Sequence, residues 1–131
     1  MIQILQPPGW AKPKGFSNGI AAAGKLVFIA GQVGFNSQGH FEEKTFQGQF
    51  KQTLKNILAV LAEAGGRPEH IVRMTWYVTD KQEYLGALKE MGAAYRELIG
   101  RHYPAMAVVQ VSGLVEDEAK LEIETTAVLP D

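Results

Sequence analysis

Two segments of the chain, residues 26–29 (LVFI) and residues 106–109 (MAVV), are apolar at four consecutive positions. Short apolar runs of this kind are typical of buried β-strands. Successive side chains of a strand point to opposite faces of a sheet, so each of these strands is apolar on both faces. The sheet that contains them must therefore be covered on both faces, by the same chain or by another molecule.

The rest of the sequence predicts only two helices to provide that cover. Thr45 is placed to cap a helix whose apolar residues recur at helical spacing and which ends at residues 65–66, two glycines. Asp80 and, three residues later, Glu83 form a capping box for a second helix, which carries an apolar stripe and stops near residue 100. Two helices can cover only one face of a sheet.

The remaining segments are predicted to be strands and turns. A short strand opens the chain before a segment rich in proline and glycine, and Gly24 marks a tight hairpin between the next two strands. Residues 71–80 alternate apolar and polar side chains, as a half-buried strand does. After the opening strand, strands are predicted at residues 16–23, 25–31, 71–80, 105–112 and 120–129.

The predicted order, β-β-β-α-β-α-β-β, indicates an α+β fold with a single mixed sheet of five to six strands and two helices on one face. A chain of 131 residues is about the size of one domain, so we expect a single domain over residues 1–131. Because no helix is left for the second face, we expect a homo-oligomer packed through it. The alternative is that loops and the proline-rich N-terminal segment cover this face within one chain.

Composition excludes several classes of site and partner. The chain has no cysteine, which rules out disulfides and thiolate chemistry and favours a reducing compartment, so we expect the cytoplasm. Its formal net charge is −1, with lysine and arginine scattered singly, which argues against nucleic acid as a partner. No apolar run reaches the ~20 residues of a membrane span. The histidines are far apart, so we expect no metal, and no cofactor is predicted.

Three local patterns have both a functional and a structural interpretation. GFSNG, residues 15–19, matches a hydrolase nucleophile elbow around Ser17, but a strand follows it where a helix is required, so we interpret it as a turn. GQVG, residues 31–34, could let backbone N–H groups approach an anion, or could mark a bend. His102 lies just before a proline, where it is either a helix-terminal charge or a ligand contact.

The segment LEIETTAV, residues 121–128, places Glu122 and Glu124 on one face of a strand. On an edge strand, alternating glutamates form a solvated face that discourages aggregation. If this face lines a cleft between subunits instead, a carboxylate there can hold a water molecule and act as its general base.

Three motifs together identify a known family. They are FIAGQ at residues 28–32, the pattern V-x-x-T-x-Y-V-x-D at residues 72–80, and E-I-E-x-x-A-V at residues 122–128. With them the sequence resembles the Rid (reactive intermediate deaminase, YjgF) family over nearly the whole chain. The resemblance implies a fold similar to trimeric chorismate mutase, a homotrimer packed sheet to sheet, and small-molecule clefts between subunits. It also implies cofactor-independent hydrolysis of enamines and imines such as 2-aminoacrylate, giving a 2-keto acid and ammonia.

Several positions depart from the branch of the family that carries this activity. There, an arginine after Pro-Ala clamps the substrate carboxylate, whereas this chain has Met106, which offers no donors. Of the polar site residues implied by the resemblance, Gly31 and the water-binding Glu122 remain. Losing a bidentate charge-assisted contact costs a few kcal/mol, so efficient 2-aminoacrylate deamination is not expected. The other implied substrate-binding positions have also become less polar: Phe16 for tyrosine, Ala30 for serine, Gly92 for asparagine and Val108 for cysteine.

Three functions stay open at this point. The first is hydrolysis of an imine or enamine that lacks the usual carboxylate, with Glu122 positioning water and Gly31 holding the developing anion. The second is a trimer that binds or senses a metabolite without catalysis. The third is RNA cleavage, which the absence of a basic patch disfavours. The sequence also leaves open whether Arg73, Arg101 or His102 supplies a substitute positive charge.

Overall fold

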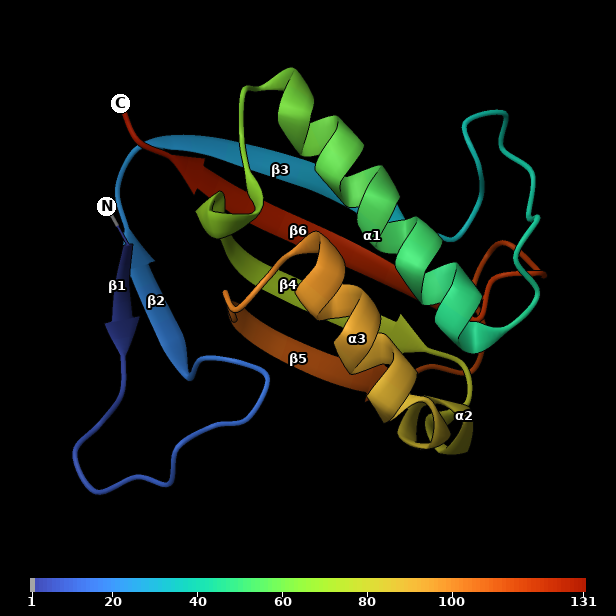
Figure 1. Ribbon diagram of the computed structural model, residues 1–131, viewed down its shortest axis with the longest axis horizontal. Helices are drawn as coiled ribbons and strands as arrows, with labels where there is room; N and C mark the ends of the chain where they lie inside the picture. Colours follow the sequence, from blue (N-terminus) through green and yellow to red (C-terminus); the bar gives the residue numbers. More distant parts are fainter. Residues whose placement is uncertain (1) are drawn as a thin grey trace.

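The computed structural model describes residues 2–131 and is an α+β fold with a four-stranded mixed sheet (Figure 1). The strands lie in the order β3-β6-β4-β5. β6 pairs antiparallel with both β3 and β4, whereas β4 and β5 are parallel. The α+β class and the mixed sheet are therefore confirmed. The strand bounds are β3 (Lys25–Gln32), β4 (Ile71–Val78), β5 (Ala105–Gln110) and β6 (Leu121–Leu129).

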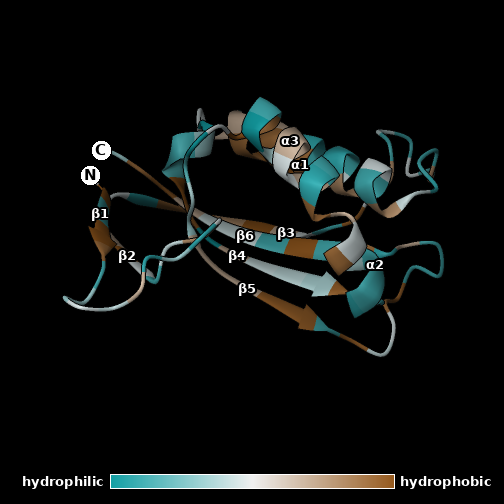
Figure 2. Cartoon of the chain, turned by 60° about the horizontal axis from the view of Figure 1, so that its bottom comes forward, coloured by the Kyte–Doolittle hydropathy of each residue, from teal (hydrophilic) through white to brown (hydrophobic). Residues whose placement is uncertain are grey.

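The longer helices lie together on one face of this sheet (Figure 2). α1 (Phe46–Glu63) begins where the sequence predicts, because the Thr45 hydroxyl accepts a hydrogen bond from the Gly48 backbone N–H at 3.0 Å. α3 (Leu88–Leu98) packs beside α1. The 3-10 helix η1 (Pro68–His70) leads into β4. Within residues 2–131, no helix is both long and apolar enough to cross a membrane.

The hydrophobic core lies between α1, α3 and the sheet. Phe50 of α1 packs against Trp76 of β4 with ring centroids 5.0 Å apart. The predicted alternation holds in β6 and in β4 from Met74 onward, since Met74, Trp76 and Ile123 point into this core. At the start of β4 a register shift buries Ile71 instead of Val72. Burying each large apolar side chain contributes roughly 1.5–3 kcal/mol. The largest fully buried apolar side chains are Phe46, Phe50, Leu54, Ile57, Leu61, Ile71, Met74, Leu121, Ile123 and Val78.

The prediction of one sheet of five to six strands is wrong. β1 (Ile2–Leu5) pairs only with β2 (Gly19–Ala22), in a separate two-stranded sheet at one end of the molecule (Figure 1). The predicted tight hairpin at Gly24 is also absent, because β3 pairs with β6. Gly24 has φ 147°, and a Cβ there would fall 2.0 Å from the Leu129 carbonyl oxygen. The glycine therefore lets the chain bend from one sheet into the other rather than reverse.

The second predicted helix and the last strand also differ from expectation. The helix is divided at Ala87 into α2 (Lys81–Gly86) and α3. Asp80 caps α2 as expected, but Glu83 binds the Lys120 ammonium at 3.1 Å instead of completing the capping box. β6 lies in the centre of the sheet, so Glu122 and Glu124 do not lie on an edge strand.

The face of the sheet opposite the helices remains open in the single chain (Figure 2). Phe28 is 75% exposed, and Leu26 and Val109 are also exposed. The N-terminal segment and the loops therefore leave these apolar side chains uncovered. An exposed apolar surface of this kind is typical of a protein–protein contact.

Candidate functional site

The structure brings Gly31 and Glu122 into direct contact. An ideal Cβ built on Gly31 would lie 2.2 Å from Glu122 Oε2 and 2.8 Å from its carboxyl carbon. A Cβ at this position would displace the Glu122 carboxylate, so the glycine permits this close approach. The contact joins an outer strand, β3, to the central strand β6, and within the sequence only the family resemblance, which assigns both residues to one site, points to it.

An irregularity in β3 accompanies this contact. The pairing of β3 with β6 shifts between Ile29 and Gln32, so Ala30 and Gly31 have no partner in register. Such bulges free backbone groups from the ladder and often lie beside active sites. Gly31 is therefore placed to present backbone groups next to a carboxylate, as the interpretation of GQVG as an anion contact requires.

The two glutamates of β6 have different surroundings. Glu124 Oε1 accepts a hydrogen bond from the Tyr77 hydroxyl at 2.7 Å, and this bond raises the pKa of Tyr77. Glu122 is half-buried and takes part in none of the ion pairs within residues 2–131. Its carboxylate is therefore the one on this face that is available to a water molecule or ligand.

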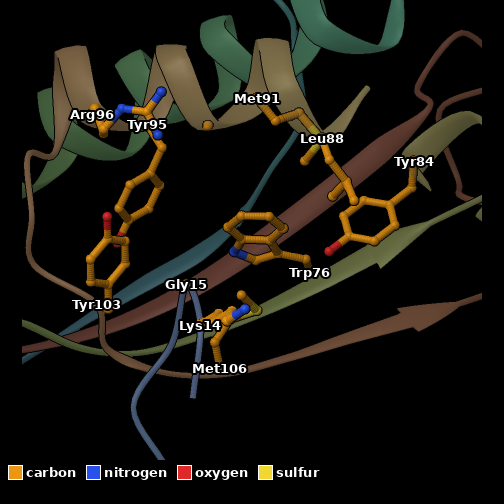
Figure 3. A pocket seen from close by; sticks show the side chains of 11 residues that line it. Lys14, Gly15, Trp76, Tyr84, Leu88, Met91, Tyr95, Arg96, Tyr103 and Met106 are labelled. Carbon is orange, nitrogen blue, oxygen red and sulfur yellow. The ribbon is translucent and has the colours of Figure 1, made fainter. Parts of the chain in front are cut away.

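Met106 lies on β5, next to Met74 of β4, and lines two cavities. The first, of about 300 Å³, lies between α3 and the sheet (Figure 3). Gly92 is among its lining residues. The second, of about 290 Å³, includes Phe16 and Arg73. Val108 lines a smaller hollow of about 160 Å³ further along β5.

The predicted site residues thus fall into two groups within one chain. Gly31, with Ala30 beside it, and Glu122 lie on β3 and β6, whereas Met106 lies on β5 at the opposite edge of the sheet. Met106 also shares the helix-facing side of the sheet with Met74, while Glu122 lies on the open face. A single chain therefore does not assemble all of the residues that the family resemblance implies.

Of the three candidate replacement cations, only Arg73 lines a cavity with Met106. The His102 ring nitrogen Nε2 lies 2.6 Å from the Ile71 carbonyl oxygen, so His102 serves the fold. Arg101 is exposed and lines neither of the cavities that include Met106. Ser17 is buried, forms a β-bridge with Ala105, and its hydroxyl donates to the Tyr103 carbonyl, so it joins two distant segments rather than forming a turn.

Two cations that the sequence does not single out line the cavity beneath α3. They are Lys14, from the loop before β2, and Arg96 of α3. Arg96 Nη1 would lie 3.2 Å from a Cβ placed on Gly92, so the guanidinium lies close over this glycine. The spacing of four residues, which puts both on one helix face, is the only sequence signal that points to this contact.

Tyr95 closes one end of the same cavity. Its ring stacks on Tyr103 with centroids 5.6 Å apart, and its hydroxyl donates to the His102 carbonyl at 2.5 Å. Burial raises the pKa of Tyr95 above its ordinary value.

The raised pKa of Tyr95 predicts a loss of stability in alkali. The folded chain retains the phenol proton at a pH where the unfolded chain releases it. The contribution to stability is therefore complete below the ordinary pKa of about 10 and decreases as the pH rises above it. We expect the free energy of unfolding, measured with urea between pH 8 and pH 11, to fall by up to about 1.4 kcal/mol per pH unit from this group. Tyr95→Phe should fall less steeply; an unchanged slope would contradict the assignment.

Comparison with known proteins identifies the family. The family model described as endoribonuclease L-PSP matches residues 10–129. A RutC family protein of Aquifex aeolicus is 35% identical over 130 residues, which cover 98% of this chain and 99% of the relative. TdcF of Escherichia coli, provisionally named a reactive intermediate deaminase, is 32% identical over 131 residues, covering 98% of this chain and 95% of TdcF.

Solved structures agree with this assignment. The Rid family protein YyfB of Yersinia pestis, of unknown function, has a TM-score of 0.86 and 28% identity, with 98% of each chain covered. RidA from an Antarctic Psychrobacter has a TM-score of 0.70 and 27% identity, with 97% of this chain and 99% of RidA covered. The sequence motifs, the mixed sheet and these matches lead to one conclusion: the chain belongs to the Rid (YjgF) family.

Proposed function

We propose that this chain forms a homotrimer whose intersubunit clefts hydrolyse an imine or enamine of a small metabolite without a cofactor. The observation that carries this proposal is the Glu122 carboxylate held over Gly31 on the open face of the sheet. The E. coli relative named for reactive intermediate deamination supports the reaction class. The lack of cysteine favours a reducing compartment, and we place the protein in the cytoplasm.

Assembly would join the two groups of site residues that one chain keeps apart. Packing through the open face buries Phe28 and its apolar neighbours, and it sets the Gly31–Glu122 pair of one subunit against another subunit. The β5 residues Met106 and Val108, together with Phe16, would form the opposite wall of each cleft. Light scattering in dilute buffer should give three times the chain mass of 14.4 kDa; a mass equal to one chain would contradict the intersubunit cleft.

The hydrolysis needs only water and the two retained groups. Glu122 accepts a proton from water as the water oxygen bonds to the imine carbon, and the electron pair of the C=N bond moves to nitrogen, which takes up a proton. The Gly31 backbone N–H stabilises the negative charge that develops on the adduct. In the second step the hydroxyl proton of the adduct passes to its nitrogen through Glu122, the C–N bond breaks, and ammonia leaves as the carbonyl product forms. An enamine enters the same route after protonation of its carbon.

The experiment follows imines produced from amino acids by an amino acid oxidase, with semicarbazide as the trap. If the protein hydrolyses the imine, less semicarbazone forms as the protein concentration is raised. No effect with any amino acid, in a protein that is trimeric, would refute the catalytic function and leave a metabolite-binding trimer. Salt-sensitive RNA binding and cleavage would instead favour the endoribonuclease activity for which the family model is described.

Met106→Arg is expected to create activity toward 2-aminoacrylate. A guanidinium at this position restores a charge-assisted contact to the carboxylate worth roughly 1.5–3 kcal/mol, or about ten- to hundredfold in kcat/KM. The measurement is pyruvate formation from 2-aminoacrylate generated in situ. Met106→Gln, similar in length but uncharged, is the control. Equal rates for the two variants would show that the cleft geometry does not place position 106 near a substrate carboxylate.

A further inference from the structure

The cavity beneath α3 has aromatic walls and cationic groups at its margin. Trp76 forms its centre, and Tyr84, Tyr95 and Tyr103 contribute further rings (Figure 3). Its volume of about 300 Å³ lies at the lower end of the range for small-molecule sites. The cavity is formed within one chain, so a ligand can be bound there without a contribution from a partner subunit.

The indole N–H of Trp76 has no hydrogen-bond partner among residues 2–131. Its Nε1 atom is buried, and the whole residue is only 7% exposed. In Figure 3 this nitrogen lies on the side of the ring that faces Tyr95 and Tyr103. Buried donors in native proteins are almost always paired, so this N–H is available to an acceptor in the cavity, either a water molecule or an oxygen of a ligand.

The charge of the lining selects an anion. Lys14 and Arg96 line the cavity, and its lining contains no aspartate or glutamate. Neither cation takes part in an ion pair within residues 2–131. Arg96 lies close over Gly92, where a larger side chain would compete with the guanidinium for space. Gly92, where the family resemblance implies an asparagine, therefore leaves space for the Arg96 guanidinium.

We infer that this cavity binds an organic acid with an aromatic side chain, with Arg96 holding its carboxylate and Lys14, on the opposite side of the cavity, adding to the positive charge of the lining. The rings of Trp76 and Tyr103 contact the aromatic group, and the Trp76 N–H donates to an oxygen of the ligand. The guanidinium of Arg96, on α3, thereby replaces the positive charge that Met106 lacks. A cavity of this size accommodates a longer molecule than 2-aminoacrylate. Binding of the acid does not depend on the proposed function. Only its role as the substrate rests on the proposed hydrolysis.

The test uses 3-phenylpropanoate as the probe and the indole N–H resonances as the readout. The chain has only two tryptophans, Trp10 and Trp76, and Trp10→Phe assigns the signal of Trp76. We expect 3-phenylpropanoate to shift the Trp76 resonance saturably. 3-Phenylpropanamide, which lacks the charge, and propanoate, which lacks the ring, should each bind at least about tenfold more weakly, the ratio set by one lost contact.

Variants locate the carboxylate. Arg96→Gln should weaken binding of 3-phenylpropanoate by about tenfold. Lys14→Gln should weaken it less, because Lys14 lies on a loop and its ammonium offers a point charge without the paired donors of a guanidinium. Lys89→Gln removes a charge from the exposed side of the same helix and should change nothing. Equal affinity in the wild type and in Arg96→Gln would overturn the inference. The inference would also be overturned if Arg73→Gln lost binding while Arg96→Gln kept it. The acid would then lie in the second cavity, which Phe16 and Arg73 line.

A second measurement separates this inference from the proposed function. If imines from phenylalanine are hydrolysed faster than those from alanine, both are supported. If 3-phenylpropanoate binds with the Trp76 shift but no imine is hydrolysed, the binding site stands and the proposed function fails. If alanine imines are hydrolysed and 3-phenylpropanoate does not bind, the function stands and the inference fails.

Discussion

Glu122→Gln is expected to slow imine hydrolysis by about 10²- to 10⁴-fold, the usual contribution of a positioned general base. Glutamine keeps the shape of the side chain over Gly31 but cannot accept a proton from water. Substrate binding should change little, so the loss should appear in kcat rather than in KM. The measurement is the rate of semicarbazone suppression across a range of imine concentrations.

Glu124→Gln is the matched control for this variant. Glu124 lies two residues further along β6 on the same face, and its carboxylate is engaged by the Tyr77 hydroxyl. Both substitutions remove one negative charge from the same strand, so a general effect of charge would lower both rates. We expect near wild-type kcat for Glu124→Gln. Equal losses in both variants would show that Glu122 has no specific role as the base.

Phe28→Glu is expected to separate the subunits and abolish activity. Phe28 is 75% exposed in the single chain, and burying it in an interface would contribute roughly 1.5–3 kcal/mol in each subunit. A carboxylate there adds the cost of burying an unpaired charge. The mass measured by light scattering should fall to that of one chain. The isolated chain should stay folded by circular dichroism, because Phe28 lies outside the core.

Val115→Glu provides the comparison. Val115 is 98% exposed in the loop between β5 and β6, so the substitution adds the same charge to an apolar surface position away from the sheet. We expect it to leave the mass and the activity unchanged. A Phe28→Glu variant that remained a trimer would contradict the role of this face in assembly. A variant with the mass of one chain and full activity would show that the cleft between subunits is not the site of the reaction.

Glu122→Gln and Phe28→Glu test the proposed cleft between subunits. Arg96→Gln tests the cavity that one chain forms beneath α3. Glu122 lies on the central strand, Phe28 on an outer strand, and Arg96 on the helix layer. A ligand that reaches from the cavity beneath α3 toward the Gly31–Glu122 pair of another subunit would respond to all three. Binding without turnover would respond to Arg96→Gln alone.

The sequence by itself determined the elements whose signals are local. Thr45 caps α1 by accepting a hydrogen bond from the backbone N–H of Gly48, three residues later. Both groups lie in the same short stretch of sequence, so the cap can be predicted without knowing the tertiary structure. The alternation of β4 and β6 fixes which side chains face the core, since a strand has a period of two wherever it lies in a sheet. The apolar residues at 26–29 indicated a face that one chain leaves open, and Phe28 is indeed exposed there. The family motifs identified the family.

The tertiary structure alone decided which strands pair and which side chains meet. The β2–β3 hairpin expected at Gly24 does not form, because β3 gains a longer partner in β6, some 100 residues away along the chain. The contact of Gly31 with Glu122 depends on that pairing and on a bulge that no local pattern encodes. The cavity cations also come from a loop and a helix that only packing brings together. Pairing between distant segments depends on the free energy of the whole core, which no single stretch of residues determines.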